Sequence, residues 1–230
     1  MASIYLDGDY LANHPTWHSE DSAIKARWID AILRRNSQSP ARVVEVGCGA
    51  GGVISELQKL RPDADYVGYE ISPDAFQLSR AHANDRLIYR NADILEADEA
   101  GFDALLLIDV FEHVPDYMGF LRSLRDRAGI KIFHIPLDLS AQAVARGTPY
   151  RHLRSVVGHL HYFHKESALA TLVDCGYSIV DHMYTCGSQE MPNRPLKTKL
   201  LNVVRKLFEM VSRDASARLL GGYSLMVLAR

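Results

Sequence analysis

The sequence predicts an α/β domain with a doubly wound, mostly parallel sheet, and three observations support this prediction. An apolar, β-branched run at 41–46 stops at four glycines within residues 47–52, and a helix-compatible stretch at 53–60 follows. Six more strand-like runs alternate with helix-like stretches along the chain, which is the pattern of an α/β fold. The run at 102–109 is apolar enough to be buried on both faces, as parallel strands usually are.

The composition suits one globular domain. The chain has 230 residues, of which 47% are hydrophobic and 23% charged, and its formal net charge of −2 gives no global attraction to nucleic acid. Three cysteines without CxxC spacing indicate neither a disulfide framework nor a zinc site. No run approaches the roughly 20 apolar residues of a membrane span, and residues 1–10 lack the basic region of a signal peptide. We therefore expect a cytoplasmic protein.

The first 39 residues are expected to form a helical lid, and residues 40–230 a single compact domain. Residues 1–18 are aromatic and irregular, and capping residues at 19–22 precede a helix to about Arg35 with Ile24, Trp28 and Ile32 on its apolar side. A segment placed before the first strand can cover a ligand at the sheet edge. The alternative is that residues 17–18 fill a corner of the core.

The remaining elements are expected in alternating order. Pro73 suits the first turn of a helix, and Gly176 suits the end of another. Residues 136–158 are expected to form a long polar loop, and loops of this length are usually functional or mobile. The expected strands are 65–71, 87–92, 102–109, 130–135, 177–185 and 223–229, and the expected helices after 53–60 are 73–84, 116–127, 165–175 and 197–211.

Glu45 and the glycines after it form the first motif. The glycine spacing alone fits both GxGxG and the dinucleotide fingerprint GxGxxG, but a carboxylate at the end of a buried strand is costly without a role. With Glu45 included, the stretch resembles motif I of the class I S-adenosylmethionine-dependent methyltransferases. In that family the acid and the glycine turn hold the amino-acid end of the cofactor. The resemblance implies cofactor contacts from Glu45, Gly47, Cys48 and Gly49.

Two further acids follow strands in the order that this family shows. Glu70 ends the second strand, where an acid in an open parallel sheet reaches ribose hydroxyls. That position, with Ile71 beside it, fits either a nicotinamide cofactor or S-adenosylmethionine. After the third strand, the resemblance implies that Asp93 receives the adenine amino group and that Ile94 flanks the ring. A lone aspartate after a strand is otherwise most often a turn residue.

The run D-V-F-E-H-V at 109–114 is the second strong motif. It follows the fourth strand, and ligands bind at the C-terminal edge of such a sheet. The run resembles that of small-molecule methyltransferases related to the ubiquinone-pathway O-methyltransferases. The resemblance implies cofactor contacts from Asp109 and Val110, and S-adenosyl-L-methionine as the cofactor. It also implies a Rossmann-like, doubly wound sheet of seven strands in which the last strand is antiparallel.

A histidine is the expected proton acceptor. Methyl transfer asks for little beyond in-line positioning, because the sulfonium is an activated leaving group. A hydroxyl acceptor usually also needs a base that works near neutral pH, which favours histidine. His113 is the first candidate because it lies beside the expected cofactor edge, and His161 and Asp138 follow. Each has a structural alternative as a capping or core histidine or a turn aspartate.

The same motif also contains a candidate metal site. Asp109, Glu112 and His113 resemble a cluster that holds a divalent cation in some ubiquinone-pathway O-methyltransferases, although mixed oxygen and nitrogen ligands suit magnesium, manganese or zinc only loosely. We expect no metal, because Asp109 should point partly toward the cofactor and this competes with ligation. A weaker candidate cluster consists of three histidines, His159, His161 and His164.

The sequence therefore predicts transfer of a methyl group from S-adenosylmethionine to a small molecule, through an oxygen of a sugar or specialised metabolite. A nicotinamide-dependent oxidoreductase would explain the glycines and Glu70 but not Glu45 or Asp93. A base-modifying methyltransferase would carry an Asn/Asp-Pro-Pro-aromatic run where this chain has D-V-F-E, so no nucleic-acid partner is expected. A non-catalytic cofactor-binding protein stays an alternative.

Overall fold

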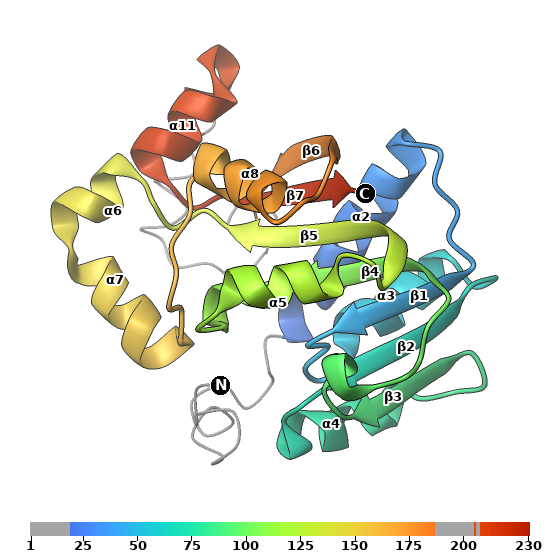
Figure 1. The fold of residues 1–230 in the computed structure, drawn as a ribbon. Coiled ribbons are helices and arrows are strands. Elements are labelled where there is room, and N and C mark those ends of the chain that lie inside the picture. The colour runs from blue at the N-terminus through green and yellow to red at the C-terminus, as the bar shows by residue number, and fades with distance from the viewer. Residues whose placement is uncertain (1–18, 187–204, 206–207) are drawn as a thin grey trace.

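The computed structural model describes residues 19–186, 205 and 208–230, and a mixed sheet of seven strands lies at its centre (Figure 1). The strand order is β3-β2-β1-β4-β5-β7-β6. The first five strands of the chain pair in parallel, whereas β7 is antiparallel to both of its neighbours. The predicted fold class is confirmed, including the reversed last strand. The strands span Arg42–Val46 (β1), Asp65–Glu70 (β2), Leu87–Asn91 (β3), Phe102–Ile108 (β4), Ala128–Pro136 (β5), Ile179–Thr185 (β6) and Ser224–Ala229 (β7).

Helices cover both faces of the sheet (Figure 1). On one face, α2 (Ser22–Arg35) and α3 (Gly52–Leu60) share a core cluster with the sheet. On the other, α5 (Tyr117–Leu124) and α8 (Lys165–Asp174) contribute to the second cluster. The predicted helix at 73–84 divides into α4 (Pro73–Ser79) and the short η3 (Arg80–His82), and α4 packs beside β3.

The central strand β4 connects the two core clusters. Its side chains alternate between the faces, so that Leu105 and Leu107 lie in one cluster and Leu106 and Ile108 in the other. The three leucines are completely buried. Because burying a leucine side chain contributes about 1.5–3 kcal/mol, this strand fixes the centre of the sheet and, with it, the position of the loop that follows.

The loop expected at 136–158 is largely helical, which corrects that prediction. It contains α6 (Ala141–Arg146), α7 (Thr148–His152) and η6 (Leu153–Val157). Ser140 caps α6 by accepting a hydrogen bond from the Ala143 backbone, and Pro149 stands in the first turn of α7. Figure 1 shows α6 and α7 beyond the C-terminal end of β5. This insertion therefore flanks the edge of the sheet where ligands bind.

Two predictions about the ends of the chain fall partly outside the described residues. The predicted helix at 197–211 lies mostly there, and the structure adds α11 (Arg213–Leu220), which the sequence did not predict. Residues 1–18 also lie outside, so the lid stays a prediction. Within α2, Ile29, Ile32 and Leu33 belong to the core. None of the helices in the described part of the chain combines the length and apolar character that a membrane crossing requires.

Candidate active site

The glycine turn after β1 can be built only with glycine at its ends. Gly47 and Gly51 have φ angles of +69° and +77°, a region that other residues rarely adopt. A Cβ on Gly51 would lie 2.6 Å from the ring of Tyr89, and one on Gly47 would lie 2.9 Å from Val110 Cγ2. The Gly47 and Cys48 backbone N–H groups donate to the Tyr69 carbonyl at 2.8 and 3.0 Å, which joins the turn to β2.

Glu70 at the end of β2 holds this turn from the other side. Its carboxylate is buried and accepts hydrogen bonds from the backbone N–H groups of Gly49 at 2.8 Å and Ser72 at 2.7 Å. Burial raises the pKa of Glu70, and the hydrogen bonds from Ser72 and Gly49 oppose that rise. Each carboxylate oxygen has a second lone pair, so Glu70 can still accept hydroxyl hydrogens of a ligand.

Glu45 lies at the end of β1 with only 2% of its surface exposed. One of its carboxylate oxygens has no hydrogen-bond partner among the described residues. Burial raises the pKa of Glu45 to about 8, while the charge of Lys25 and a backbone hydrogen bond from Ile54 oppose the rise. A buried, half-satisfied carboxylate beside a glycine turn is suited to a ligand that brings a cationic hydrogen-bond donor.

The other predicted cofactor residues occupy three different environments. Cys48 is buried in the turn, and Asp93 caps η4 (Ile94–Glu96) by accepting a hydrogen bond from Leu95 N at 2.9 Å. Ile94 is almost fully buried, and Ile71 follows β2 at the sheet edge with partial exposure. This cap is the turn role that the sequence offers as the alternative for Asp93. It uses one carboxylate oxygen and leaves the second for a ligand.

Asp109 enters an internal network that the sequence did not predict. Its carboxylate lies 2.9 Å from Lys25 Nζ on α2 and 2.6 Å from His134 Nδ1 on β5. Burial would raise the pKa of Asp109, but His134 and Lys25 lower it well below its usual value. The carboxylate is therefore held charged between Lys25 and His134. The candidate metal cluster of Asp109, Glu112 and His113 does not form around it.

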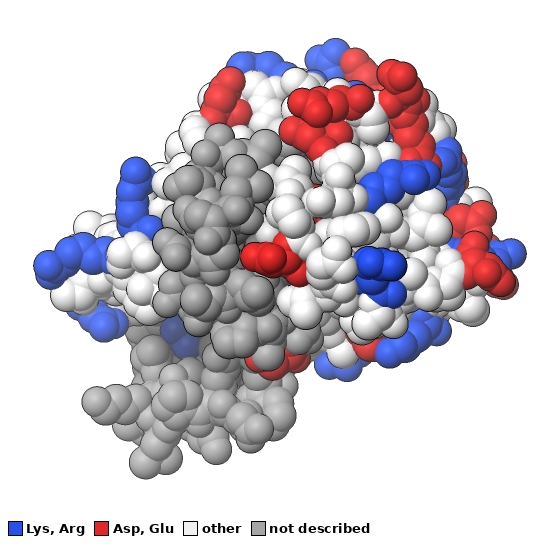
Figure 2. Space-filling model, turned by 90° about the horizontal axis from the view of Figure 1, so that it is seen from below, with Lys and Arg blue, Asp and Glu red and all other residues white. Residues whose placement is uncertain are grey.

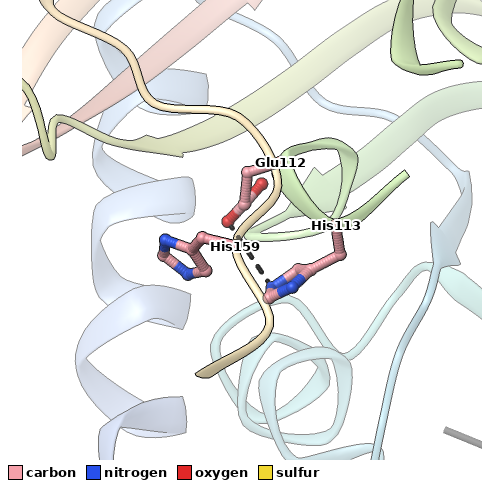
Figure 3. Close-up of side chains that lie close together, drawn as sticks. All are labelled: Glu112, His113 and His159. Atoms are coloured by element: carbon pink, nitrogen blue, oxygen red, sulfur yellow. Dashed lines mark ion pairs between the residues drawn. The ribbon is translucent and has the colours of Figure 1, made fainter. Parts of the chain in front are cut away.

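Glu112, His113 and His159 come together at the C-terminal end of β4 (Figure 3). The first two lie on η5 (Phe111–His113), and His159 lies on the irregular segment between η6 and α8. That segment is tied down because the Leu160 and His161 backbone N–H groups both donate to the Glu112 carbonyl, at 2.8 and 3.1 Å.

Glu112 is the acid of this cluster, and it is deeply buried. Its side chain is 1% exposed, and neither carboxylate oxygen has a hydrogen-bond partner among the described residues. The His113 ring lies beside it, with Nε2 4.0 Å from Glu112 Oε1. Burial, followed by the charge of Asp109, raises the pKa of Glu112 well above its ordinary value.

The two histidines are oriented by different partners. His159 Nδ1 lies 2.7 Å from Asp138 Oδ2, and its ring centroid is 4.8 Å from that of His113. Burial and the neighbouring His159 lower the pKa of His113 to about 4, although a hydrogen bond with the Gly158 backbone opposes this shift. His113 is therefore neutral at pH 7, and Asp138 fixes the ring of His159 rather than standing alone.

His161 and His164 are directed elsewhere. His161 Nε2 lies 3.0 Å from the Val114 carbonyl, and its ring packs on Tyr117. His164 caps α8 by accepting from Ser167 N. The candidate cluster of three histidines therefore does not form. His159 lies beside Glu112 and His113 instead. The three candidate ligand atoms of that group lie within 4.8 Å of one another, so they could hold a divalent cation.

A cavity of about 570 Å³ is lined by Asp138, the hydrogen-bond partner of His159, but not by Glu112, His113 or His159 themselves. A cavity of this size suits a metabolite rather than a polymer segment. Among its lining residues are two arginines and a histidine from the inserted helices and from beside α11, namely Arg146, His152 and Arg205. The remaining wall comes from the end of β5, α6, α7 and the start of β7, including Leu137, Ser140, Gln142, Pro149 and Tyr223.

Comparisons with known proteins agree with this arrangement. A family model described as a methyltransferase domain matches residues 17–182. The chain is 36% identical over 94 residues to a ubiquinone biosynthesis O-methyltransferase of Xylella fastidiosa, covering 38% of this chain and 37% of that one. It is 30% identical over 125 residues to a protein of the same name from Xanthomonas axonopodis, covering 51% and 52%. The matches thus span between about two fifths and half of these relatives.

Solved structures show the same fold at lower identity. Magnesium protoporphyrin IX methyltransferase of Synechocystis with bound S-adenosylhomocysteine has a TM-score of 0.60 at 15% identity and covers 90% of this chain and 82% of that one. The putative methyltransferase in a complex with the Haloferax volcanii Trm112 activator has a TM-score of 0.65 at 14% identity, with 97% and 94% covered. The family match covers most of the chain, and the sheet order and glycine turn agree with it. The chain belongs to the methyltransferase domain family.

Proposed function

We propose that this chain is an enzyme that transfers a methyl group from S-adenosyl-L-methionine to an oxygen of a small molecule. The observation that carries the proposal is Glu45, a buried carboxylate with an oxygen left unpartnered among the described residues, beside the glycine turn. The family match supports the reaction type, and one structural neighbour holds S-adenosylhomocysteine. When bound, the cofactor supplies a methyl group on a positively charged sulfur.

The residues around the turn fit each part of this cofactor. Glu45 would bind its ammonium group, and the Gly47–Gly49 backbone would approach its amino-acid end closely. Glu70 would accept hydrogen bonds from the ribose hydroxyls while it keeps its own bonds to the turn. Asp93 would accept from the adenine amino group, with Ile94 beside the ring. Ile71 and Val110 would complete the apolar walls.

The acceptor would bind in the cavity beside Asp138, with its reacting oxygen near the Glu112 cluster. His113 is neutral and can accept a proton there, although its low pKa makes it a weak base. Asp138 acts through the ring of His159, and His161 is engaged by the Val114 carbonyl. The names of the curated relatives support an oxygen acceptor on a small molecule.

A second version of the reaction uses a divalent cation to lower the pKa of the acceptor hydroxyl. It is favoured by the two oxygens of Glu112, which have no hydrogen-bond partner among the described residues, because Glu112, His113 and His159 together offer a carboxylate and two imidazoles. Asp138 would orient His159, as second carboxylates do around metal-bound histidines. The version without a metal stays our expectation, since Asp109, the third residue of the sequence cluster, is held by Lys25 and His134.

Two assays test the proposal. The protein is incubated with S-adenosylmethionine and a panel of catechols, hydroxybenzoates and hydroxylated sugars, and S-adenosylhomocysteine is quantified by mass spectrometry. Formation of S-adenosylhomocysteine that depends on the acceptor supports methyl transfer. Oxidation of NADH without formation of S-adenosylhomocysteine would point to an oxidoreductase. Repeating the active reactions in EDTA, and then with added magnesium or zinc, separates the two versions. Activity that persists in EDTA supports the version without a metal.

A further inference from the structure

Lys25 on α2 occupies a buried position that the proposed reaction does not use. Its ammonium group lies 3.0 Å from Asp21 and 2.9 Å from Asp109, and only 13% of its side chain is exposed. Burial opposes the charge of Lys25, yet Asp109 and Asp21 raise its pKa above the ordinary value. Breaking a buried ion pair by removing one partner strands the other charge, so this contact is costly to lose.

Asp109 is the point where three elements meet. Besides Lys25, its carboxylate contacts His134 Nδ1 at 2.6 Å, and His134 Nε2 lies 2.9 Å from Thr185 Oγ1 on β6. Trp28, one turn after Lys25, stacks on the His134 ring with centroids 5.6 Å apart. Asp109 at the end of β4 thereby links α2 to β5 and, through His134, to β6, in addition to the direct ion pair of Arg35 on α2 with Asp181 on β6.

The backbone of Asp109 adopts an unusual conformation that leads directly to the glycine turn. Its φ angle is +54°, in the left-handed region that only aspartate, asparagine and glycine adopt at low cost. The next residue, Val110, packs against Gly47 so closely that a Cβ there would lie 2.9 Å from Val110 Cγ2. The conformation of Asp109 therefore sets how Val110 presses on the turn.

We propose that Lys25 is a positioning residue for the cofactor turn, which it controls by holding Asp109 and, through it, Val110 against Gly47. This inference rests on the proposed function, because the turn is taken to bind S-adenosylmethionine. Nothing in the sequence links Lys25 to the turn, since 22 residues separate it from Gly47 and 84 from Asp109. The N-terminal helix would thus be part of the cofactor site without touching the cofactor.

Calorimetric titration with S-adenosylhomocysteine and S-adenosylmethionine tests this inference. Lys25→Met should weaken both ligands by roughly tenfold or more, the size of effect expected for an outer residue that orients a binding group. An equal loss for both ligands is expected from a changed turn and also from the lost charge of Lys25 near Glu45. Asp109→Asn decides between the two, because it keeps Lys25 and should still weaken both ligands if the turn is what changes. Lys25→Arg should keep most of the affinity, because the guanidinium can still reach Asp21 and Asp109.

The matched control is Lys165→Met, because Lys165 is similarly covered at 18% exposure and pairs with Asp214 at 2.5 Å. Both variants should lose stability in urea unfolding, but only Lys25→Met should lose ligand affinity. Asp109→Asn keeps a residue that tolerates the left-handed conformation, and adding Lys25→Met to it should cause little further loss. If Lys25→Met fails to fold, Asp109→Asn and Lys25→Arg carry the comparison.

The outcomes separate this inference from the proposed function. Wild-type protein that binds neither ligand would contradict the proposed function. Wild-type protein that binds both, with unchanged or tighter binding in Lys25→Met, would overturn the positioning role. Affinity losses in Lys25→Met and Asp109→Asn that simply add in the double variant would also overturn it, because the two residues would then act separately.

Discussion

Glu45 and Glu112 are carboxylates that the fold buries without fully satisfying them. Each has at least one oxygen without a hydrogen-bond partner among the described residues. Such a group costs free energy in the absence of a ligand, because it has lost its hydration. Both lie at the C-terminal edge of the sheet, where the proposed reaction takes place. The destabilisation therefore comes from residues that the proposed reaction uses.

The first prediction concerns the pH dependence of stability at Glu45. The pKa of Glu45 is about 8 in the folded state, above the ordinary 4.5. The contribution of Glu45 to the stability of the folded protein is therefore complete below about pH 4.5. It is lost as the pH rises through about 8. Glu45→Gln should make the decline in the free energy of unfolding between pH 5 and pH 8 shallower, because it removes the contribution of Glu45. Urea unfolding at three pH values measures it, with the exposed Glu96→Gln as control. Parallel curves for Glu45→Gln and wild type would disprove the burial effect.

The second prediction compares two acids that are proposed to bind the nucleoside. Glu70→Ala should weaken S-adenosylhomocysteine binding by about 1–3 kcal/mol, because it removes both the ribose contact and the support of Gly49 N. Asp93→Ala should cost less, since water can replace a single hydrogen bond to the adenine amine. Calorimetry on both folded variants measures the difference. An unchanged dissociation constant for Glu70→Ala would place the ribose elsewhere.

The third prediction concerns His113. If it accepts the proton, His113→Ala should keep its affinity for S-adenosylhomocysteine and lose roughly 10²–10⁴-fold in turnover. The exposed His82→Ala serves as the control in the same assay, with an acceptor found in the panel. Full turnover of His113→Ala would remove the assignment. His159, which Asp138 orients, would then be the next residue to replace, before His161.

At the scale of elements, the cofactor turn allows a comparison between two glycines. Gly51 and Gly147 both have positive φ angles, of +77° and +64°, so alanine is strained at either position. A Cβ at Gly51 would meet the Tyr89 ring at 2.6 Å, whereas one at Gly147 would have no atom within 4 Å.

The fourth prediction follows from this difference. Gly147→Ala should lose about 1–2 kcal/mol of stability from backbone strain alone and keep its ligand affinity. Gly51→Ala should lose more stability and should also bind S-adenosylhomocysteine more weakly, because the turn must move away from Tyr89. Urea unfolding and calorimetry on both variants measure this. Equal affinity in the two variants would mean that the turn does not determine binding.

The strands could be predicted from sequence because each is a short apolar run between turn residues, and β4 is apolar enough to mark a strand with two covered faces. The sequence does not predict α6 and α7 because 136–158 is polar and contains Gly147, which separates two short helices. Ser140 caps α6, whereas α7 has only Pro149 in its first turn. The position of α6 depends on the hydrogen bond that Ser140 accepts from Ala143 N and on contacts with α11, which a hydrophobic pattern does not report.

The same contrast holds for the candidate site. Glu45, the glycines and Glu70 lie at fixed offsets from strand ends, so spacing identifies them as candidates. Lys25 and His159 could not be assigned, because Lys25 reaches Asp109 only after α2 packs on the sheet, and His159 reaches Glu112 only after the inserted helices return. For the same reason the sequence does not predict that Lys25 and His134 bind Asp109 in place of a metal cluster.

For the whole molecule, the sheet order brings these distant segments to one edge. The central β1 and β4 end beside each other, which places the glycine turn next to residues 109–113. On the face shown in Figure 2, the described lysine and arginine side chains are interspersed with aspartate and glutamate. This distribution matches the net charge of −2 and favours the cavity beside Asp138, rather than a charged surface, as the acceptor site.

The most direct test of the central claim is calorimetric titration of the wild-type protein with S-adenosylhomocysteine and, separately, with NADH. The claim is that Glu45, the glycine turn and Glu70 form a site for S-adenosylmethionine. It predicts saturable binding of S-adenosylhomocysteine at one site per chain, loss of that binding in Glu45→Gln, and no heat of binding with NADH. Tight binding of NADH with no response to S-adenosylhomocysteine would contradict it.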